Sequence, residues 1–198
     1  MAGVAIGNFD GVHLGHRALV ARAAEAAGPT AVLTFEPHPR ALFRKDDPPF
    51  RLGTVASRRR RMAEQGVDLL IEQTFDDGFA SLEAEAFADL LAETLRPRLV
   101  VVGEGFRFGR GRKGDAALLA RRLGDDAQLV VLEPVLDRQG LMVSSSRVRD
   151  ALRDGAPDQA AALLGAPWEI EGAVFEGDRR GRQLGYPTAN VKMDGLLR

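Results

Sequence analysis

Short apolar runs alternate along the chain with longer segments in which apolar residues recur at helical spacing. The helical pattern is clearest where Phe87, Leu91 and Leu95 fall on one face. We therefore predict strands at 4–6, 30–35, 68–73, 99–102 and 128–132, and helices at 14–27, 55–65, 82–95 and 115–123.

This alternation of strands and helices predicts the fold class. Strands that are apolar without interruption are typical of a parallel sheet covered by helices on both faces, so we expect a Rossmann-like α/β fold. In such sheets, ligands bind beyond the carboxyl ends of the strands. The loops at 7–10, 35–39 and 103–109 should therefore line one crevice.

The segment GNFDGVHLGH at 7–16 contains two of the three histidines of the chain, His13 and His16. It joins a predicted strand to a predicted helix, where free backbone N–H groups and the positive end of the helix dipole attract phosphate. Its glycines let the backbone approach a ligand, and the two imidazoles add hydrogen-bond donors. We therefore predict a nucleotide phosphate site. The alternatives are a tight connection with a helix-capping histidine, or a zinc site, for which the chain offers no cysteine and only His38 in addition.

A second helix start is predicted at VSSSRVRDAL, 143–152. Serine side chains cap the free N–H groups of a helix, and capping alone is one interpretation of Ser144, Ser145 and Ser146. The other interpretation adds phosphate binding, because the forked guanidinium of Arg149 lies one turn inside the helix.

The composition narrows the classes of protein. Of the 198 residues, 45% are hydrophobic and 28% are charged with a net charge of −1, which favours a folded core without attraction for nucleic acid or anionic membranes. The chain has no cysteine, no apolar run approaching the ~20 residues of a membrane span, and no signal-peptide pattern at its start. We expect a cytoplasmic protein with no nucleic-acid or membrane partner, and we interpret Arg58–Arg61 as a solvated helix face. The oligomeric state stays open.

Four motifs in order carry a family resemblance. GNFDGVHLGH, TFEPHP at 34–39, VVGEGFRFGRGRKGD at 101–115 and VSSSRVRDAL resemble the FMN adenylyltransferase module of prokaryotic-type bifunctional FAD synthetases, which are HxGH nucleotidyltransferases. The segment from Gly172 to Asn190, which ends in PTAN, resembles the opening of their riboflavin kinase module. The resemblance implies an adenylyltransferase nucleotide-binding domain at 1–155, a linker with a helix at 156–167, and the truncated start of a kinase β-barrel at 168–198. It also implies a fragment of a longer protein.

The chemistry implied is transfer of the adenylyl group of ATP to FMN, giving FAD and pyrophosphate with Mg²⁺ present. By resemblance, His13 and His16 hold the triphosphate and the transition state, and Arg149 reaches the β- and γ-phosphates. No metal ligand is assigned. The residues expected to bind ATP are Gly7, Asn8, Phe9, Asp10, Gly11, Gly103, Ser144, Ser145 and Ser146.

The flavin is expected at Glu36, Pro37, His38 and Phe106. A plain turn is the alternative for the proline-flanked His38, and an ordinary core position is the alternative for Phe106. The family usually has Asp in place of Glu36 and an acidic or amide residue in place of Gly105. The second departure favours another hypothesis, a catalytically silent module that binds flavin or nucleotide.

From Trp168 onward, WEIEGAVFEG has a strand pattern. By resemblance, Thr188 and Asn190 approach magnesium and ATP phosphates in the kinase module. The full-length parent would also phosphorylate riboflavin. Because the strands that close such a barrel are missing here, we expect no riboflavin kinase activity from this chain. An HxGH enzyme with another phosphorylated acceptor, such as a pantetheine phosphate, is the remaining alternative.

Overall fold

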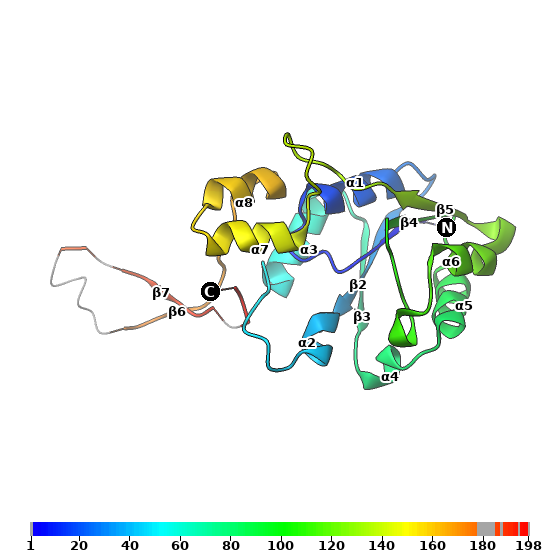
Figure 1. The fold of residues 1–198 in the computed structure, drawn as a ribbon, viewed down its shortest axis with the longest axis horizontal. Helices are drawn as coiled ribbons and strands as arrows, with labels where there is room; N and C mark the ends of the chain where they lie inside the picture. The colour runs from blue at the N-terminus through cyan, green and yellow to red at the C-terminus, as the bar shows by residue number, and fades with distance from the viewer. Residues whose placement is uncertain (1, 178–184, 187, 194, 198) are drawn as a thin grey trace.

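The computed structural model describes residues 2–177, 185–186, 188–193 and 195–197. Five parallel strands form one sheet in the order β3-β2-β1-β4-β5 (Figure 1). This confirms the predicted Rossmann-like α/β fold. The strands are β1 Gly3–Ile6, β2 Thr30–Glu36, β3 Leu69–Thr74, β4 Leu99–Gly103 and β5 Gln128–Leu132.

Helices connect the strands and follow the last one. The main helices are α1 Leu14–Ala23, α3 Val55–Glu64, α5 Ala84–Leu95, α6 Ala116–Leu123, α7 Ser145–Arg153 and α8 Pro157–Leu164. The short ones, which the sequence did not predict, are α2 Pro39–Phe43, α4 Asp77–Ala80 and the 3-10 turns Arg110–Arg112 and Gly124–Asp126. In the described ranges, no helix is both long and apolar enough to cross a membrane.

The central strands of the sheet, β1, β2 and β4, are buried on both faces. Val4 and Ile6 of β1 belong to a core cluster that includes side chains of α5 and α6, whereas Ala5 belongs to a cluster with side chains of α1 and α3. This alternation follows from the period of two along a strand. Both faces of the central strands are therefore covered, which leaves the ends of these strands for a ligand.

Helices α7 and α8 share a third apolar cluster beside the sheet. Val148, Leu163 and Leu164 pack there with Leu52 from the loop before α3 and with Leu197. The predicted linker helix is thus α8, which packs against α7. The division of the chain at 155 and 167 stays a prediction.

The C-terminal part differs from the expected strand at 168–177. Only β6 Val174–Phe175 forms, and it pairs antiparallel with β7 Asn190–Val191 away from the main sheet (Figure 1). Residues 168–173 form no strand because their side chains contact α3 and the loop before it. The start of a barrel is not confirmed, and Pro187 of the PTAN element lies outside the described residues.

Candidate functional site

The connection from β1 to α1 is a strained turn. Phe9 and Val12 both have positive φ, +50° and +46°, which L residues rarely adopt and which costs most for a β-branched side chain. Both side chains are fully buried, and this packing holds the turn in place. Gly11 has φ +88°, and a Cβ there would lie 2.8 Å from Leu52 Cδ1. Such strain is typical of binding sites rather than of plain connections.

The two imidazoles of the motif lie against each other at the start of α1. Their ring centroids are 3.6 Å apart and the rings are nearly parallel, at 18°. His13 caps the helix, because its Nδ1 accepts a hydrogen bond from the His16 backbone N–H at 3.3 Å. A neutral imidazole that accepts at Nδ1 carries its proton on Nε2. Nε2–H of His13 is therefore a donor fixed in direction. The structure thus shows His13 as a helix cap, and its contact with a phosphate through Nε2–H stays a prediction.

Gly15 makes room for this arrangement. A Cβ at Gly15 would lie 3.1 Å from Cε1 and 3.2 Å from Nδ1 of His13, closer than most real contacts. A side chain at Gly15 would therefore displace the first imidazole by a few tenths of an ångström.

Both imidazoles are neutral at neutral pH. The pKa of His13 is lowered to about 4, mainly by burial; the charge of Asp10 opposes this shift and the charge of Arg149 adds to it. Burial and the neighbouring His13 hold the pKa of His16 well below its usual range. Nδ1 of His16 is buried with no hydrogen-bond partner in the described part of the chain. The pair therefore offers hydrogen bonds to a ligand without adding a positive charge.

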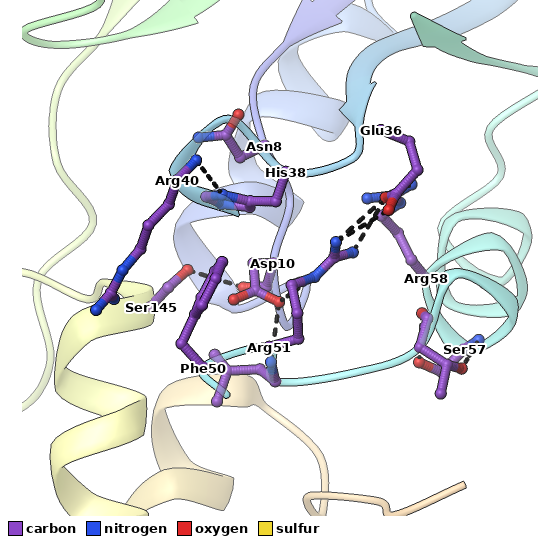
Figure 2. A network of polar contacts seen from close by, with 12 residues as sticks. Asn8, Asp10, Glu36, His38, Arg40, Phe50, Arg51, Ser57, Arg58 and Ser145 are labelled. Carbon is purple, nitrogen blue, oxygen red and sulfur yellow. Dashed lines mark hydrogen bonds and ion pairs between the residues drawn. The ribbon is translucent and has the colours of Figure 1, made fainter. Parts of the chain in front are cut away.

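Asp10 is the centre of a buried polar cluster (Figure 2). It is only 3% exposed, and Oδ1 accepts from the Leu52 backbone N–H at 3.0 Å. Oδ2 accepts from Nη2 of Arg149 at 2.6 Å, and Nε of Arg149 donates to the Phe50 carbonyl at 2.8 Å. Arg149 is thus buried and bonded to Asp10 and Phe50. The expected contact of Arg149 with the β- and γ-phosphates stays a prediction.

Two helix N-termini meet at this cluster. Ser144 caps α7 by accepting from the Arg147 backbone N–H at 3.4 Å, and Ser145 Oγ donates to the Asp10 carbonyl at 2.8 Å. The Ser145 bond ties the first turn of α7 to the turn that starts α1. Free N–H groups and positive dipole ends of both helices therefore face one region, which favours an anion there.

The structure brings the expected ATP residues together in part. Asn8 accepts a hydrogen bond from Thr34 Oγ1 at 3.2 Å through its carbonyl, and Gly103 ends β4, which pairs with β1. No atom lies within 4 Å of a Cβ built on Gly103, so the strand end is open there. Gly7, Phe9, Asp10 and Gly11 form the turn, and Ser144, Ser145 and Ser146 begin α7. Their contacts with ATP stay predictions.

The loop expected to hold flavin lines a cavity of about 510 Å³. Glu36, Pro37 and His38 contribute to its wall, together with Phe50. His38 caps α2 by accepting from the Arg40 backbone N–H at 3.1 Å, its ring lies edge-on to Phe50, and burial lowers its pKa to about 4. A neutral, packed His38 differs from the exposed residue of a plain turn.

Phe106 lies elsewhere. It packs against the core cluster of the sheet, with its ring centroid 5.5 Å from that of Phe108, and it does not line this cavity. These contacts favour the core interpretation of Phe106, and its contact with flavin stays a prediction.

We predicted that Arg58–Arg61 form a solvated helix face, and this prediction is wrong for Arg58, which is only 3% exposed. Its Nη2 donates to Glu36 Oε2 at 2.9 Å and to Glu72 Oε1 at 2.6 Å, because β2 and β3 place these carboxylates under α3. Hydrogen bonds from Arg59 and Arg58 lower the pKa of Glu72, although burial alone would raise it. Arg59, Arg60 and Arg61 also have partners: Glu72, the pair Glu169 and Glu171, and the Pro167 carbonyl.

Sequence reasoning missed Phe50, Arg51 and Leu52. Figure 2 shows Arg51 between Asp10 and Glu36: its Nε lies 3.6 Å from Asp10 Oδ1, and Nη1 donates to Glu36 at 3.2 Å. Nothing in the local pattern PPFRLG indicates this role, because both partners are distant in sequence. Arg51 therefore connects residues 7–16, the motif predicted to bind phosphate (the phosphate motif), with the loop expected to hold flavin.

The described residues do not fit a resident magnesium site. No group of three or more His, Asp or Glu side chains among them could hold a metal ion. Asp10, the carboxylate within the motif at 7–16, has both oxygens engaged by Leu52 and Arg149. We therefore derive no step through a metal held by protein ligands.

A parallel α/β sheet whose first strand leads through a turn to two stacked imidazoles at the start of a helix is typical of the nucleotidyltransferase-like class. A family model described as FAD synthetase matches residues 1–147, and one described as riboflavin kinase matches residues 164–197. The chain belongs to the FAD synthetase family, as the sequence motifs predicted.

Similar proteins agree with this assignment. A bifunctional riboflavin kinase/FMN adenylyltransferase of Escherichia coli (strain K12) is 42% identical over 193 residues, which cover 95% of this chain and 62% of the relative. One from Pseudomonas fluorescens is 39% identical, with the same shares covered. A crystal structure described as a macrolide-efflux protein from Streptococcus pneumoniae has a TM-score of 0.83 and 34% identity, and the match covers 98% of this chain and 64% of that one. The chain thus spans about three fifths of the length of these curated relatives.

Proposed function

We propose that the chain transfers the adenylyl group of ATP to FMN, forming FAD and releasing pyrophosphate. The observation that carries the proposal is the stacked His13–His16 pair at the point where the N-termini of α1 and α7 meet. The family and the names of the relatives supply the acceptor, FMN. They do not favour the two alternatives, a silent binding module or an enzyme with another phosphorylated acceptor.

The reaction needs alignment and charge stabilisation rather than a covalent intermediate. A phosphate oxygen of FMN attacks the α-phosphorus of ATP, the bond from that phosphorus to the bridging oxygen breaks, and its electron pair leaves with pyrophosphate. The attacking phosphate is already anionic and needs no general base. Nε2–H of His13 donates to an oxygen of the reacting phosphate, where negative charge increases in the transition state.

The negative charge of the triphosphate would be stabilised by positive groups around His13 and His16. The N-termini of α1 and α7 supply backbone N–H groups, and Arg149 supplies a cation beside them. Arg149 can bind the β- and γ-phosphates only through N–H groups that are not already bonded to Asp10 and Phe50. We propose that ATP enters as its magnesium complex, in which phosphate oxygens and water ligate the ion.

The flavin ring system is proposed to occupy the cavity lined by Glu36, Pro37, His38 and Phe50. Its volume of about 510 Å³ lies within the range of small-molecule sites, ~300–1,000 Å³. The carboxylate of Glu36 is already bonded to Arg51 and Arg58, so Glu36 acts there by shaping the wall.

Riboflavin kinase activity is proposed for a longer protein of the relatives' length, not for this chain. Thr188 is exposed, and the Asn190 amide lies against Gly177, where a Cβ would come within 2.4 Å of Nδ2. Roles for Thr188 and Asn190 in binding magnesium and ATP stay proposals.

Acceptor-dependent release of pyrophosphate tests the function. The purified chain is incubated with MgATP and FMN, riboflavin or a pantetheine phosphate, and pyrophosphate is measured. We expect pyrophosphate to be released with FMN and not with the other two acceptors. Release with another phosphorylated acceptor but not with FMN would refute the proposed substrate. Binding of FMN and ATP without release would favour the silent module and direct attention to Gly105, which has a φ of +73° and no neighbouring atom within 4 Å of a Cβ.

A further inference from the structure

Residues Phe50–Leu52 form a strip that is bonded to the phosphate motif on one side. The Phe50 carbonyl accepts from Nε of Arg149 at 2.8 Å, and the Leu52 N–H donates to Asp10 at 3.0 Å. Phe50 and Leu52 are 6% and 3% exposed. The strip thus fixes where Asp10 and Arg149 lie, because it satisfies polar groups that burial would otherwise leave unpaired.

Three further backbone groups of the strip are bonded to the C-terminal part of the chain. The Arg51 N–H donates to the Gly195 carbonyl at 3.3 Å, and the Arg51 carbonyl accepts from Leu197 at 2.9 Å. The Leu52 carbonyl accepts from the indole N–H of Trp168 at 2.8 Å. Leu52 is therefore bonded through its N–H to the phosphate motif and through its carbonyl to Trp168.

The segment Pro167–Glu171 is held in place along α3. Arg60 pairs with Glu169 at 2.5 Å and with Glu171, Thr54 Oγ1 donates to Glu171 at 3.2 Å, and Arg61 donates to the Pro167 carbonyl at 3.1 Å. The ion pairs with Glu171 raise the pKa of Arg60. Side chains of Thr54, Arg60 and Arg61 thus contact this segment at three of its residues.

We propose that this segment, which lies in the part of the chain that matches the riboflavin kinase model, positions the ATP site of the adenylyltransferase part. Trp168 is the positioning residue: it acts through Leu52 on Asp10 and Arg149. The inference rests on the proposed function. Because Leu52 bonds both Asp10 and Trp168, we expect binding of ATP to change the surroundings of the indole as well.

ATP affinity of substituted chains tests the proposal. Trp168→Phe keeps an aromatic ring and removes the N–H that Leu52 needs. One neutral hydrogen bond of about 1 kcal/mol corresponds to about a fivefold change in affinity. We expect Trp168→Phe to weaken ATP binding about fivefold in equilibrium dialysis, at a temperature where its circular dichroism matches that of the unsubstituted chain. The control is Phe175→Leu, which alters an aromatic residue of the same C-terminal part that is 53% exposed, and it should leave affinity unchanged.

Unchanged ATP affinity in Trp168→Phe would overturn the inference while leaving the proposed function intact. Failure of the unsubstituted chain to bind ATP would instead refute the proposed function, and the inference with it. The two failures are therefore distinguishable by the unsubstituted chain alone.

A second measurement needs no variant, since Trp168 is the single tryptophan of the chain. We expect its fluorescence to change as MgATP is added without flavin, with a midpoint equal to the dissociation constant from dialysis. Saturating ATP that leaves the fluorescence unchanged would contradict the coupling.

Discussion

The buried pair of Asp10 and Arg149 should contribute far more to stability than an exposed pair of the same chemistry. Asp10→Ala removes the acceptor of Nη2 of Arg149 and of the Leu52 N–H. The Arg149 side chain is 8% exposed, so a cation would remain with little water to replace the lost carboxylate. Removing one partner of a buried pair costs about 3–5 kcal/mol.

Asp89→Ala is the matched control. Asp89 pairs with Arg122 at 3.1 Å on the surface, where the two side chains are 41% and 40% exposed. Such exposed pairs contribute about 0–1 kcal/mol, because water replaces the lost partner. Because both variants replace an aspartate of an Asp–Arg pair by alanine, the difference in their stability reports the effect of burial.

Urea unfolding followed by circular dichroism measures both variants. With a slope of about 2 kcal/mol per molar urea, Asp10→Ala should lower the midpoint by about 2 M and Asp89→Ala by less than about 0.5 M. Equal shifts of the urea midpoint in the two variants would refute the claim that the Asp10–Arg149 pair stabilises the fold because it is buried.

Three further predictions follow from the same geometry. Gly15→Ala should reduce FAD formation about tenfold or more without lowering the unfolding midpoint, because its Cβ would displace the His13 ring while alanine favours a helix; an unchanged rate measured by chromatography would contradict this. His38 has a pKa of about 4 in the folded chain, so between pH 7.5 and 5 it gains a proton only in the unfolded chain, and the free energy of unfolding decreases as the pH is lowered. Urea unfolding at both pH values should show a decrease about 2 kcal/mol smaller in His38→Gln than in the unsubstituted chain. Equal decreases in the two proteins would argue against a buried neutral imidazole. Riboflavin and MgATP should give no FMN with this chain, and FMN seen by chromatography would refute that expectation.

The sheet and the phosphate motif could be predicted because their signals are local. Apolar runs such as LVVV at 99–102 have the composition of buried strands, and HxGH combines rare residues in a short span. The helix predicted at 14–27 ends earlier, at Ala23, since helix ends depend on caps and packing that the pattern does not specify.

The contacts that the sequence did not reveal join residues far apart in the chain. Arg58 in an arginine run has the pattern of a solvated helix, yet it is buried because Glu36 and Glu72 lie beneath it. The strand pattern from Trp168 fails for a similar reason: the indole and the two glutamates bond to the loop before α3 and to α3 itself. Pairing over such distances follows from the tertiary fold and not from local spacing.

The most direct test of the account is formation of FAD by the chain and by His13→Ala. MgATP and FMN are incubated with each protein, and FAD is measured by chromatography, with circular dichroism as a check on folding. Loss of one donor to the transition state costs about 10²–10³ in rate, so we predict FAD from the unsubstituted chain and a decrease of that size in His13→Ala. Equal rates in the two proteins would contradict a reaction centred on the stacked imidazoles.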